Sequence, residues 1–334
     1  MSLLLDEIAL AAARLAEAGV EAPRAEAELI AAHVHGVRRT ELHSVPDVAF
    51  DARFWEGVGR RAAREPLQHI TGRAYFRYLE LEVGPGVFVP RPETEVMTGW
   101  AIDRLREMDV AEPVVADLGT GSGAIALSIA QEVPRARVHM VEADPIARDW
   151  TRRNLERCAV AAPYTRGRVS LHGADFTAAP RPASAGAGAP GGGLPGGGAP
   201  GGGEPGGRPG GGEPGAEGLR ELDGKVDLVI SNPPYIPLGA SVPPEVGEYD
   251  PPAALWSGAD GLDAIRGVER AARRLLRPGG LVAVEHGAPQ GAAVYWVFCE
   301  EAGWRDTRNH KDLARRDRFV TAAWPGERAD GWTG

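Results

Sequence analysis

Apolar side chains recur at helical spacing through roughly the first seventy residues. In the first such run they fall every three or four positions: Leu5, Ile8, Ala12 and Leu15. This spacing places them on one face of a helix that ends near Gly19. Residues 25–34 and 51–64 repeat the pattern, the latter with Asp51 as a candidate N-cap. We therefore expect residues 1–74 to form a small helical bundle.

The pattern changes to near-alternation after this bundle. The apolar positions there are Tyr78, Leu79, Leu81 and Val83. A turn-forming Gly84-Pro85-Gly86 follows, and then the apolar run 87–89. Apolar strands on either side of a glycine turn are typical of a β-hairpin. We expect a hairpin over residues 75–92 that links the helical bundle to a second domain.

From residue 113 onward, short apolar runs alternate with helical patterns. The expected strands are 114–116, 138–141, 169–171, 226–230 and 281–284. The expected helices include 124–132 and 263–276, the second ending before Pro278-Gly279-Gly280. This alternation predicts a doubly wound α/β domain over 93–330, with a mostly parallel sheet covered by helices on both faces. A last run, 318–323, is expected to close the sheet as an antiparallel edge strand.

One segment departs from the composition of a packed domain. Residues 181–220 hold 18 of the 45 glycines and 7 of the 28 prolines, in an approximate five-residue repeat. Almost nothing in this segment can be buried to offset its ordering entropy. We expect a disordered, tolerated insert and assign it no chemistry; a tether or protein-binding arm is the alternative.

Composition and charge exclude several classes of protein. Apolar runs such as 281–284 are far shorter than the roughly 20 residues of a membrane-spanning helix, and the first residues do not match a signal peptide. The two cysteines, Cys158 and Cys299, form no C-x-x-C pair, so neither a disulfide framework nor a zinc site is supported. The net charge of −9 argues against a globally basic nucleic-acid binder. We expect a cytoplasmic protein without a metal site.

A glycine-rich turn, Asp117-Leu118-Gly119-Thr120-Gly121-Ser122-Gly123, joins a predicted strand to a predicted helix. Glycines there let the backbone pass close to a ligand, and the helix N-terminus offers unpaired N–H groups. The spacing is neither the G-x-G-x-x-G of dinucleotide binders nor a P-loop. It suits a nucleoside with a carboxylate-bearing tail, such as S-adenosylmethionine, with a purely structural turn as the alternative.

Acidic residues follow the next two strands. Glu142 and Asp144 come at the end of strand 138–141, where one carboxylate could accept hydrogen bonds from both ribose hydroxyls. We prefer Glu142, because it follows the strand directly, and expect the other acid to be an ordinary strand-end carboxylate. After strand 169–171, Asp175 could accept from an adenine amino group while Phe176 packs on the ring, although a lone Phe there is more often core.

The motif that points to a reaction is Asn232-Pro233-Pro234-Tyr235, at the end of strand 226–230. A planar NH₂ group is a weak nucleophile because its nitrogen lone pair is delocalised. Two acceptors that grip both N–H bonds turn the lone pair outward and stabilise positive charge developing on nitrogen. The side-chain oxygen of Asn232 and the carbonyl of Pro233 are the expected acceptors, held rigidly by the prolines.

In this interpretation Tyr235 gives the planar group a flat face. The motif would hold nitrogen and methyl about 3–3.5 Å apart, which is a proximity effect. Because the N-protonated product amide is strongly acidic, we expect its proton to leave to water without a dedicated general base. The alternative is a rigid Pro-Pro turn with no chemistry.

Further stretches carry a family resemblance across nearly the whole chain outside the insert. They are EPLQHITG (65–72), FVPRPETE (88–95), GLDAIRGVERAARRLLRPGG (261–280), EHGAPQ (285–290) and DLARRDRFV (312–320). With these stretches the chain resembles the PrmC/HemK family of protein-(glutamine-N5) methyltransferases, which modify peptide chain release factors. The resemblance implies a seven-stranded, Rossmann-like class I methyltransferase sheet with S-adenosyl-L-methionine as cofactor.

The resemblance also implies roles for individual residues. The loop from Gly119 through Thr120, Gly121 and Ser122 to Gly123 would hold the cofactor, with Glu142 on the ribose and Asn232 beside the methyl. The family usually has Asp in place of Glu142 and often Trp in place of Phe176, so stacking is kept and an indole hydrogen bond is lost. The substrate would be the glutamine of a Gly-Gly-Gln loop, held by Asn232–Tyr235, with 88–95 lining the cleft.

Two alternatives and one surface feature stay open at this stage. A nucleic-acid methyltransferase could use the same motif on a flipped base, although the net charge weighs against it. A catalytically idle docking protein is the other alternative. We expect a monomer that docks release factors through its helical domain and binds no nucleic acid directly. Five arginines near the hairpin are expected to be a solvated face, or less often a partner-facing one: Arg60, Arg61, Arg64, Arg73 and Arg77.

Overall fold

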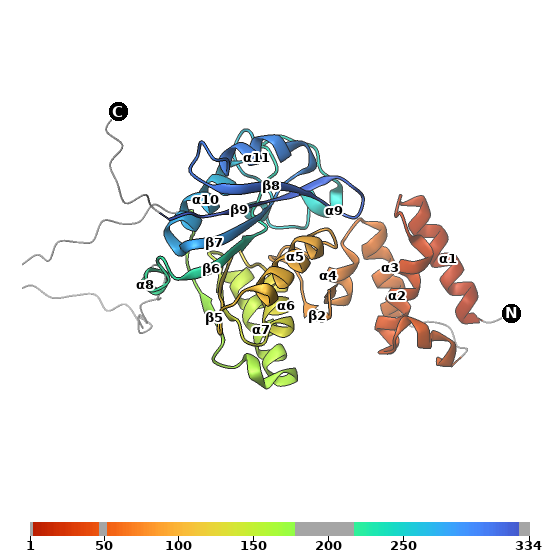
Figure 1. The fold of residues 1–334 in the computed structure, drawn as a ribbon. Helices are drawn as coiled ribbons and strands as arrows, with labels where there is room; N and C mark the ends of the chain where they lie inside the picture. The colour runs from red at the N-terminus through yellow and green to blue at the C-terminus, as the bar shows by residue number, and fades with distance from the viewer. Residues whose placement is uncertain (1–2, 47–51, 178–216, 327–334) are drawn as a thin grey trace, which may run out of the picture.

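The computed structural model describes residues 3–46, 52–177 and 217–326. In these ranges the chain forms a helical bundle, a two-stranded sheet and a seven-stranded sheet, with the bundle to one side of the larger sheet (Figure 1). The predicted N-cap Asp51 and nearly all of the predicted insert lie outside the described residues. None of the helices in the described part is long and apolar enough to cross a membrane.

The helical bundle is built from α1 (Leu3–Glu17), α2 (Pro23–His35), η1 (Arg39–Ser44), α3 (Ala52–Ala62) and α4 (Leu67–Thr71). The buried face of α1 runs through Leu4, Ile8, Ala11 and Leu15. The sequence prediction was wrong on Leu5, which is 53% exposed. The helical period of 3.6 fits Leu4 and Ile8 on one face as well as it fits Leu5, so spacing alone did not choose between them.

A β-hairpin follows the bundle, but earlier than predicted. Strands β1 (Arg73–Phe76) and β2 (Leu79–Glu82) pair antiparallel, with Phe76 opposite Leu79. The turn therefore lies at Arg77 and Tyr78, and Arg77 takes a left-handed φ of 50°. The run 87–89 forms no strand, so the prediction that Gly84–Gly86 is the hairpin turn was wrong.

The larger sheet has the order β5-β4-β3-β6-β7-β9-β8. Its strands are β3 (Val114–Leu118), β4 (Arg137–Val141), β5 (Val169–His172), β6 (Val226–Ser231), β7 (Leu276–Glu285), β8 (Arg305–Lys311) and β9 (Asp317–Ala323). Neighbours from β5 to β7 pair parallel, and β9 pairs antiparallel with both β7 and β8. The α-helices of this domain are α5 (Thr94–Glu107), which precedes β3, and α6 (Ala124–Glu132), α7 (Pro145–Ala161), α8 (Glu217–Arg220), α9 (Pro244–Gly247), α10 (Asp263–Leu275) and α11 (Gly291–Val297), which lie between strands.

Helices cover both faces of this sheet, as the strand–helix alternation predicted. In β6, Val229 belongs to the apolar cluster that includes α10 and α11, whereas Leu228 and Ile230 belong to the cluster that includes α5 and α6. Side chains alternate between faces along a strand, so one apolar run serves both clusters. The hairpin residues Phe76 and Leu81 extend the second cluster.

The edge of the sheet differs from the prediction. The run 318–323 is antiparallel, as expected, but it lies inside the sheet as β9, and β8 forms the edge. The β8 sequence, RDTRNHK, is polar and mostly exposed, so hydrophobic patterning gave no signal for it. Charged residues on an edge strand limit pairing with other chains.

Candidate active site

A cavity of about 1,000 Å³ opens where the parallel strands end. One side is formed by the turns that follow β3, β4, β5 and β6, which is the edge of an α/β sheet where ligands bind. The other side is formed by residues 88–94 and by the segment 242–258. This one cavity is lined by nearly all of the predicted site residues: the glycine turn 119–122, Glu142, Phe176 and the motif 232–235. The exception is Gly123, which is the N-cap of α6.

The glycine turn after β3 is built around backbone conformations that other residues rarely adopt. Gly119, Gly121 and Gly123 have φ of 72°, 57° and 86°. A Cβ on Gly119 would lie 3.4 Å from the Phe176 ring, so that ring lies close over the turn. The amides of Gly119 and Thr120 both donate to the carbonyl of Val141 at the end of β4, which fixes the turn against the neighbouring strand.

Asp117, the last acid of β3, lies fully buried beneath this turn. Its Oδ2 accepts from the Thr120 hydroxyl (2.6 Å) and from the Ala126 amide (3.2 Å). Its Oδ1 is buried without a hydrogen-bond partner. Burial raises the pKa of Asp117 to about 7. A cationic or N–H group that reached Oδ1 would satisfy this atom and favour the ionised form.

The two acids after β4, Glu142 and Asp144, both line the cavity but make different hydrogen bonds. Glu142 accepts from the amide of Gly121 (2.9 Å) and from the amide of Asp144 (2.9 Å) and lies at the cavity wall. Burial raises the pKa of Glu142 despite these bonds. Asp144 is the N-cap of α7, accepting from the amides of Ile146 and Ala147. The structure thus ties Glu142 to the glycine turn and gives Asp144 a helix-capping role.

The acid after β5 is bonded within its own turn. The Asp175 carboxylate accepts from the amide (2.8 Å) and the hydroxyl (2.6 Å) of Thr177. Asp175 is exposed, whereas Phe176 is half-buried and packs against the α10–α11 cluster while lining the cavity. Phe176 thus has a packing role and a face toward the site.

The motif after β6 is held beside the glycine turn. The hydroxyl of Ser231, the last residue of β6, donates to the carbonyl of Leu118 (2.6 Å), which joins the ends of β6 and β3. The next residue, Asn232, donates from Nδ2 to the Thr94 hydroxyl (3.2 Å). The Tyr235 carbonyl accepts from the side chain of Gln290 (2.9 Å). The motif is therefore supported by side chains far away in the sequence.

Another wall of the cavity is the segment 88–94, which is anchored by one buried carboxylate. Asp250 accepts from the amide of Val89 (3.3 Å) and from the guanidinium of Arg91 (2.5 Å), which also lies 4.8 Å over the Phe88 ring. Of the predicted stretch, Glu95 does not face the cavity but accepts from the amide of Arg77 (3.1 Å). The sequence gave no signal for Asp250, because it lies in an irregular loop.

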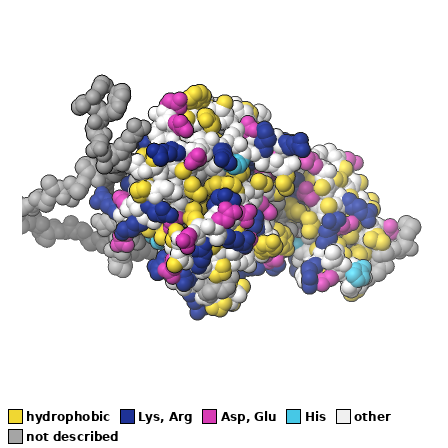
Figure 2. All heavy atoms as spheres, viewed as in Figure 1, with side chains coloured by type: hydrophobic (Ala, Val, Ile, Leu, Met, Phe, Trp, Pro, Cys, Tyr) yellow, Lys and Arg dark blue, Asp and Glu magenta, His cyan; other side chains and the backbone are white. Residues whose placement is uncertain are grey.

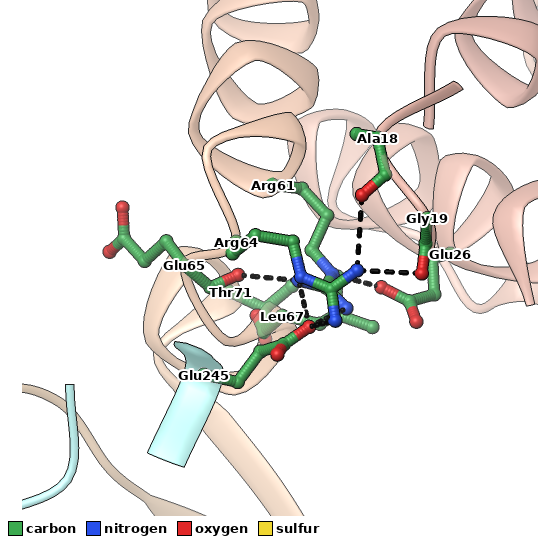
Figure 3. A network of polar contacts seen from close by, with 9 residues as sticks. All are labelled: Ala18, Gly19, Glu26, Arg61, Arg64, Glu65, Leu67, Thr71 and Glu245. Carbon is green, nitrogen blue, oxygen red and sulfur yellow. Dashed lines mark hydrogen bonds and ion pairs between the residues drawn. The ribbon is translucent and has the colours of Figure 1, made fainter. Parts of the chain in front are cut away.

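The other rim of the cavity is fastened to the helical bundle. We call residues 242–246 the α9 lip; its lining residues are Val242, Pro243 and Val246. Glu245 in this lip pairs with Arg64 (2.6 Å) and Arg61 (3.1 Å) of the α3 segment, and Arg61 also pairs with Glu26 of α2 (Figure 3). Arg61 is only 6% exposed. The prediction of a solvated arginine face was therefore wrong for Arg61, which belongs to an internal ion-pair network.

Sequence reasoning gave no role to another buried acid, although the stretch 285–290 that carries the family resemblance begins with it. Glu285, the last residue of β7, is 1% exposed, and its carboxyl group lies near the side chains of Thr94 and Tyr235. Its Oε2 has no partner, and burial raises the pKa of Glu285 to about 7. The available signal was an acid that directly follows an apolar run. We used this signal for Glu142 but not for Glu285.

Comparison with known proteins identifies two domain families in the chain. The PrmC N-terminal domain matches residues 8–72 and the methyltransferase small domain matches residues 84–175. A methyltransferase from Pyrococcus furiosus is similar in structure, with a TM-score of 0.42, 17% identity and coverage of 74% of this chain and 89% of that one. The order of the strands, the glycine turn at the carboxyl end of β3 and the matching methyltransferase domain define a class I S-adenosylmethionine-dependent methyltransferase.

Curated relatives narrow the class to one family. The release factor glutamine methyltransferase of Streptomyces coelicolor is 55% identical over 96% of this chain and 98% of its own length. That of Mycolicibacterium smegmatis is 41% identical over 96% and 98%. A 4-amino-L-phenylalanine/4-methylamino-L-phenylalanine methyltransferase of Streptomyces pristinaespiralis is 37% identical over 90% and 87%. The chain belongs to the release factor glutamine methyltransferase family.

Proposed function

We propose that this protein transfers a methyl group from S-adenosyl-L-methionine to the side-chain amide nitrogen of the glutamine in a release-factor Gly-Gly-Gln loop. The observation that carries the proposal is that the motif 232–235 and the glycine turn line the same cavity. Family membership supports the substrate, since the relatives named above carry the name release factor glutamine methyltransferase.

The residues around the glycine turn fit the cofactor. The unpartnered Oδ1 of Asp117 suits an ammonium group, and Glu142 at the cavity wall suits a pair of ribose hydroxyls. Phe176 lies over Gly119, where a flat ring can stack. When bound, S-adenosyl-L-methionine supplies an electrophilic methyl group on a sulfonium. We assign Gly119 to Gly123, Glu142 and Phe176 to its binding, and add Asp117.

The motif after β6 is assigned to the substrate amide. The oxygen of Asn232 and the carbonyl of Pro233 accept its two N–H bonds, which turns the nitrogen lone pair out of conjugation and stabilises charge on nitrogen. Pro233 and Pro234 fix the backbone, and Tyr235 packs against the amide plane. The proton of the methylated amide leaves to water, so no general base is required among the residues of the cavity.

The finer description of partners is also part of the proposal. We infer a cytoplasmic monomer whose partner is the release factor itself, not nucleic acid. On the face drawn in Figure 2, Lys and Arg side chains are interspersed with Asp and Glu instead of forming one basic patch. A mixed surface gives weak attraction for a phosphate backbone. The relative that acts on an amino-phenylalanine makes a small aromatic amine the competing substrate class.

Methyl transfer from labelled S-adenosylmethionine tests the proposal. We expect label on a purified release factor, none on its Gln→Ala loop variant, and a loss of at least about 100-fold in the Asn232→Ala enzyme, as for removal of one preorganised charge-stabilising group. Naked DNA, ribosomal RNA and 4-amino-L-phenylalanine serve as competing substrates. Label on one of these alone would replace the proposed substrate. Cofactor binding without methyl transfer to any of these substrates would instead support a catalytically idle docking protein.

A further inference from the structure

Asn232 is an ambiguous side chain unless its surroundings orient it. An asparagine amide carries an acceptor oxygen and a donor nitrogen of similar size, and the two ends exchange on a half-turn of the amide. With the oxygen toward the cavity, Asn232 accepts an N–H of the substrate amide. With the nitrogen toward the cavity, the N–H groups of Asn232 would face the N–H of the substrate amide, and two donors form no hydrogen bond. Catalysis by this residue therefore requires something to fix the amide.

The structure supplies a buried hydrogen-bond partner for the nitrogen end of Asn232. Nδ2 of Asn232 donates to the Thr94 hydroxyl (3.2 Å), and Thr94, the first residue of α5, is 3% exposed. A hydroxyl that accepts from Asn232 has its own proton free to donate elsewhere. The carboxyl group of Glu285, buried at the end of β7, lies near the Thr94 side chain.

The direction of the observed bond follows from its donor. The amide nitrogen of Asn232 can only donate, so the Thr94 oxygen is the acceptor and its own proton is free to point toward the Glu285 carboxyl group nearby. The buried Glu285 carboxyl group also lies near the Tyr235 side chain.

We infer that Thr94, backed by Glu285, is a positioning residue that holds the Asn232 amide with its oxygen toward the cavity. The inference rests on the proposed function and deepens it, because it explains how a side chain with two opposite ends presents only its acceptor. Neither residue is assigned contact with the reacting atoms. Both act through Asn232.

The kinetic test replaces the hydroxyl without changing its size. We expect Thr94→Val to lower kcat for the release factor at least about tenfold, the value of one hydrogen bond, while KM for the release factor and the affinity for S-adenosylmethionine change less than about threefold. Thr94→Ser keeps the hydroxyl and should retain kcat. Thr98→Val is the matched control, since Thr98 is also buried in α5 and its hydroxyl donates to the backbone carbonyl of Thr94 (3.0 Å) instead of to Asn232.

A spectroscopic test reports on Asn232 without any turnover. The chain has three asparagines, so asparagine-selective ¹⁵N labelling gives three side-chain NH₂ pairs. The Asn232 pair is assigned by its loss in Asn232→Ala, and Asn154, which donates to the carbonyls of Glu82 and Ser122, is an internal reference. In Thr94→Val we expect the Asn232 pair alone to shift and to exchange faster with water.

The outcomes separate the inference from the proposed function. If the wild-type enzyme labels no release factor, the proposed function fails, while the NH₂ spectra still decide whether Thr94 holds Asn232. Unchanged Asn232 signals in Thr94→Val, or wild-type kcat in that variant, overturn the inference. An equal loss in Thr98→Val would also overturn it, because the effect would then belong to the packing of α5.

Discussion

At the scale of single residues, two buried carboxyl groups lie next to residues that line the cavity, and each has an oxygen without a hydrogen-bond partner: Asp117 and Glu285. Burial raises the pKa of both to about 7. Their protonation therefore changes in the neutral range, unlike that of an ordinary carboxyl group in water. In the proposed function the ammonium group of the cofactor pairs with the free oxygen of Asp117. Cofactor binding then removes the free-energy cost of burying that oxygen without a partner.

The unliganded protein should lose stability as pH rises, because of Asp117. Its folded pKa of about 7 lies above the ordinary 3.8, so between these values the native state binds more protons than the unfolded state. The free energy of unfolding then falls with increasing pH. Asp117→Asn removes the part of this dependence that comes from Asp117, and between pH 4 and pH 8 the variant should gain on the order of 3 kcal/mol relative to the wild type.

Urea unfolding across this pH range measures the effect. Asp103→Asn is the control, because it removes a carboxylate whose side chain is 66% exposed on α5. The same pH dependence in wild type and Asp117→Asn would show that another group is responsible.

At the scale of elements, the hairpin and α7 together hold the glycine turn. Asn154 of α7, 1% exposed, accepts from the Glu82 amide (2.7 Å) and donates to the carbonyls of Glu82 and Ser122 (both 2.9 Å). One side chain thus joins three segments: β2, α7 and the cofactor turn. Strand β2 contributes to the site without touching the cavity.

Removal of Asn154 should destabilise the fold and loosen the turn. Asn154→Ala leaves three buried backbone groups without their partner, and each unsatisfied group costs about 1–3 kcal/mol before water enters. We expect a loss of at least about 2 kcal/mol in urea unfolding and weaker binding of S-adenosylhomocysteine by calorimetry. Arg152→Ala, on the exposed face of the same helix, should change stability by less than about 0.5 kcal/mol. Equal effects of the two substitutions would remove the special role of Asn154.

The elements also show what the sequence could predict and why. Strands β3, β4 and β6 carry apolar runs, and the parallel sheet was predicted from them. The hairpin was misplaced because Gly84 and Gly86 were interpreted as a turn, whereas they allow α7 to pack closely: a Cβ there would lie 2.7 Å from the Trp150 ring and 2.5 Å from the Ile146 side chain. The actual turn uses Arg77, which nothing in the local pattern marks.

Local sequence patterns also predict only part of the site. The glycine turn, Glu142 and the motif 232–235 are each contiguous or directly follow a strand, so the rule that parallel strands end at one edge brings them together. The contact of Thr94 with Asn232 spans 138 positions along the chain. Such a contact depends on how α5 packs against the ends of β6 and β7, which local patterning does not specify.

At the scale of the whole molecule, the ion-pair network of Arg61, Arg64, Glu26 and Glu245 joins the helical bundle to the α9 lip. The Tyr249 hydroxyl adds a hydrogen bond to the carbonyl of Ala63 (3.2 Å). A release factor that docks on the bundle would therefore meet a cavity rim already fixed in position.

Neutralising Glu245 should loosen this rim without affecting the cofactor side. Glu245→Gln leaves the buried Arg61 charge with one partner fewer, and partly buried pairs of this kind are sensitive to loss of one member. We expect KM for the release factor to rise about three- to tenfold with S-adenosylmethionine affinity unchanged, measured by steady-state kinetics and calorimetry. Glu248→Gln, exposed at the end of α9, should match the wild type. If KM rose in both Glu245→Gln and Glu248→Gln, the cause would be the change in net charge and not the ion-pair network.

The interior position of β9 has a consequence for biosynthesis. Domains of a nascent chain fold in the order of their synthesis where their contacts are complete, so the helical bundle can form early. The seven-stranded sheet cannot, because β9 follows β8 in the chain yet lies between β8 and β7. Glu285 pairs with Phe319 of β9, so the support beneath Asn232 is assembled only after that strand has left the ribosome. We therefore expect methyl transfer to be the last property that a newly made chain acquires, well after its first domain has folded.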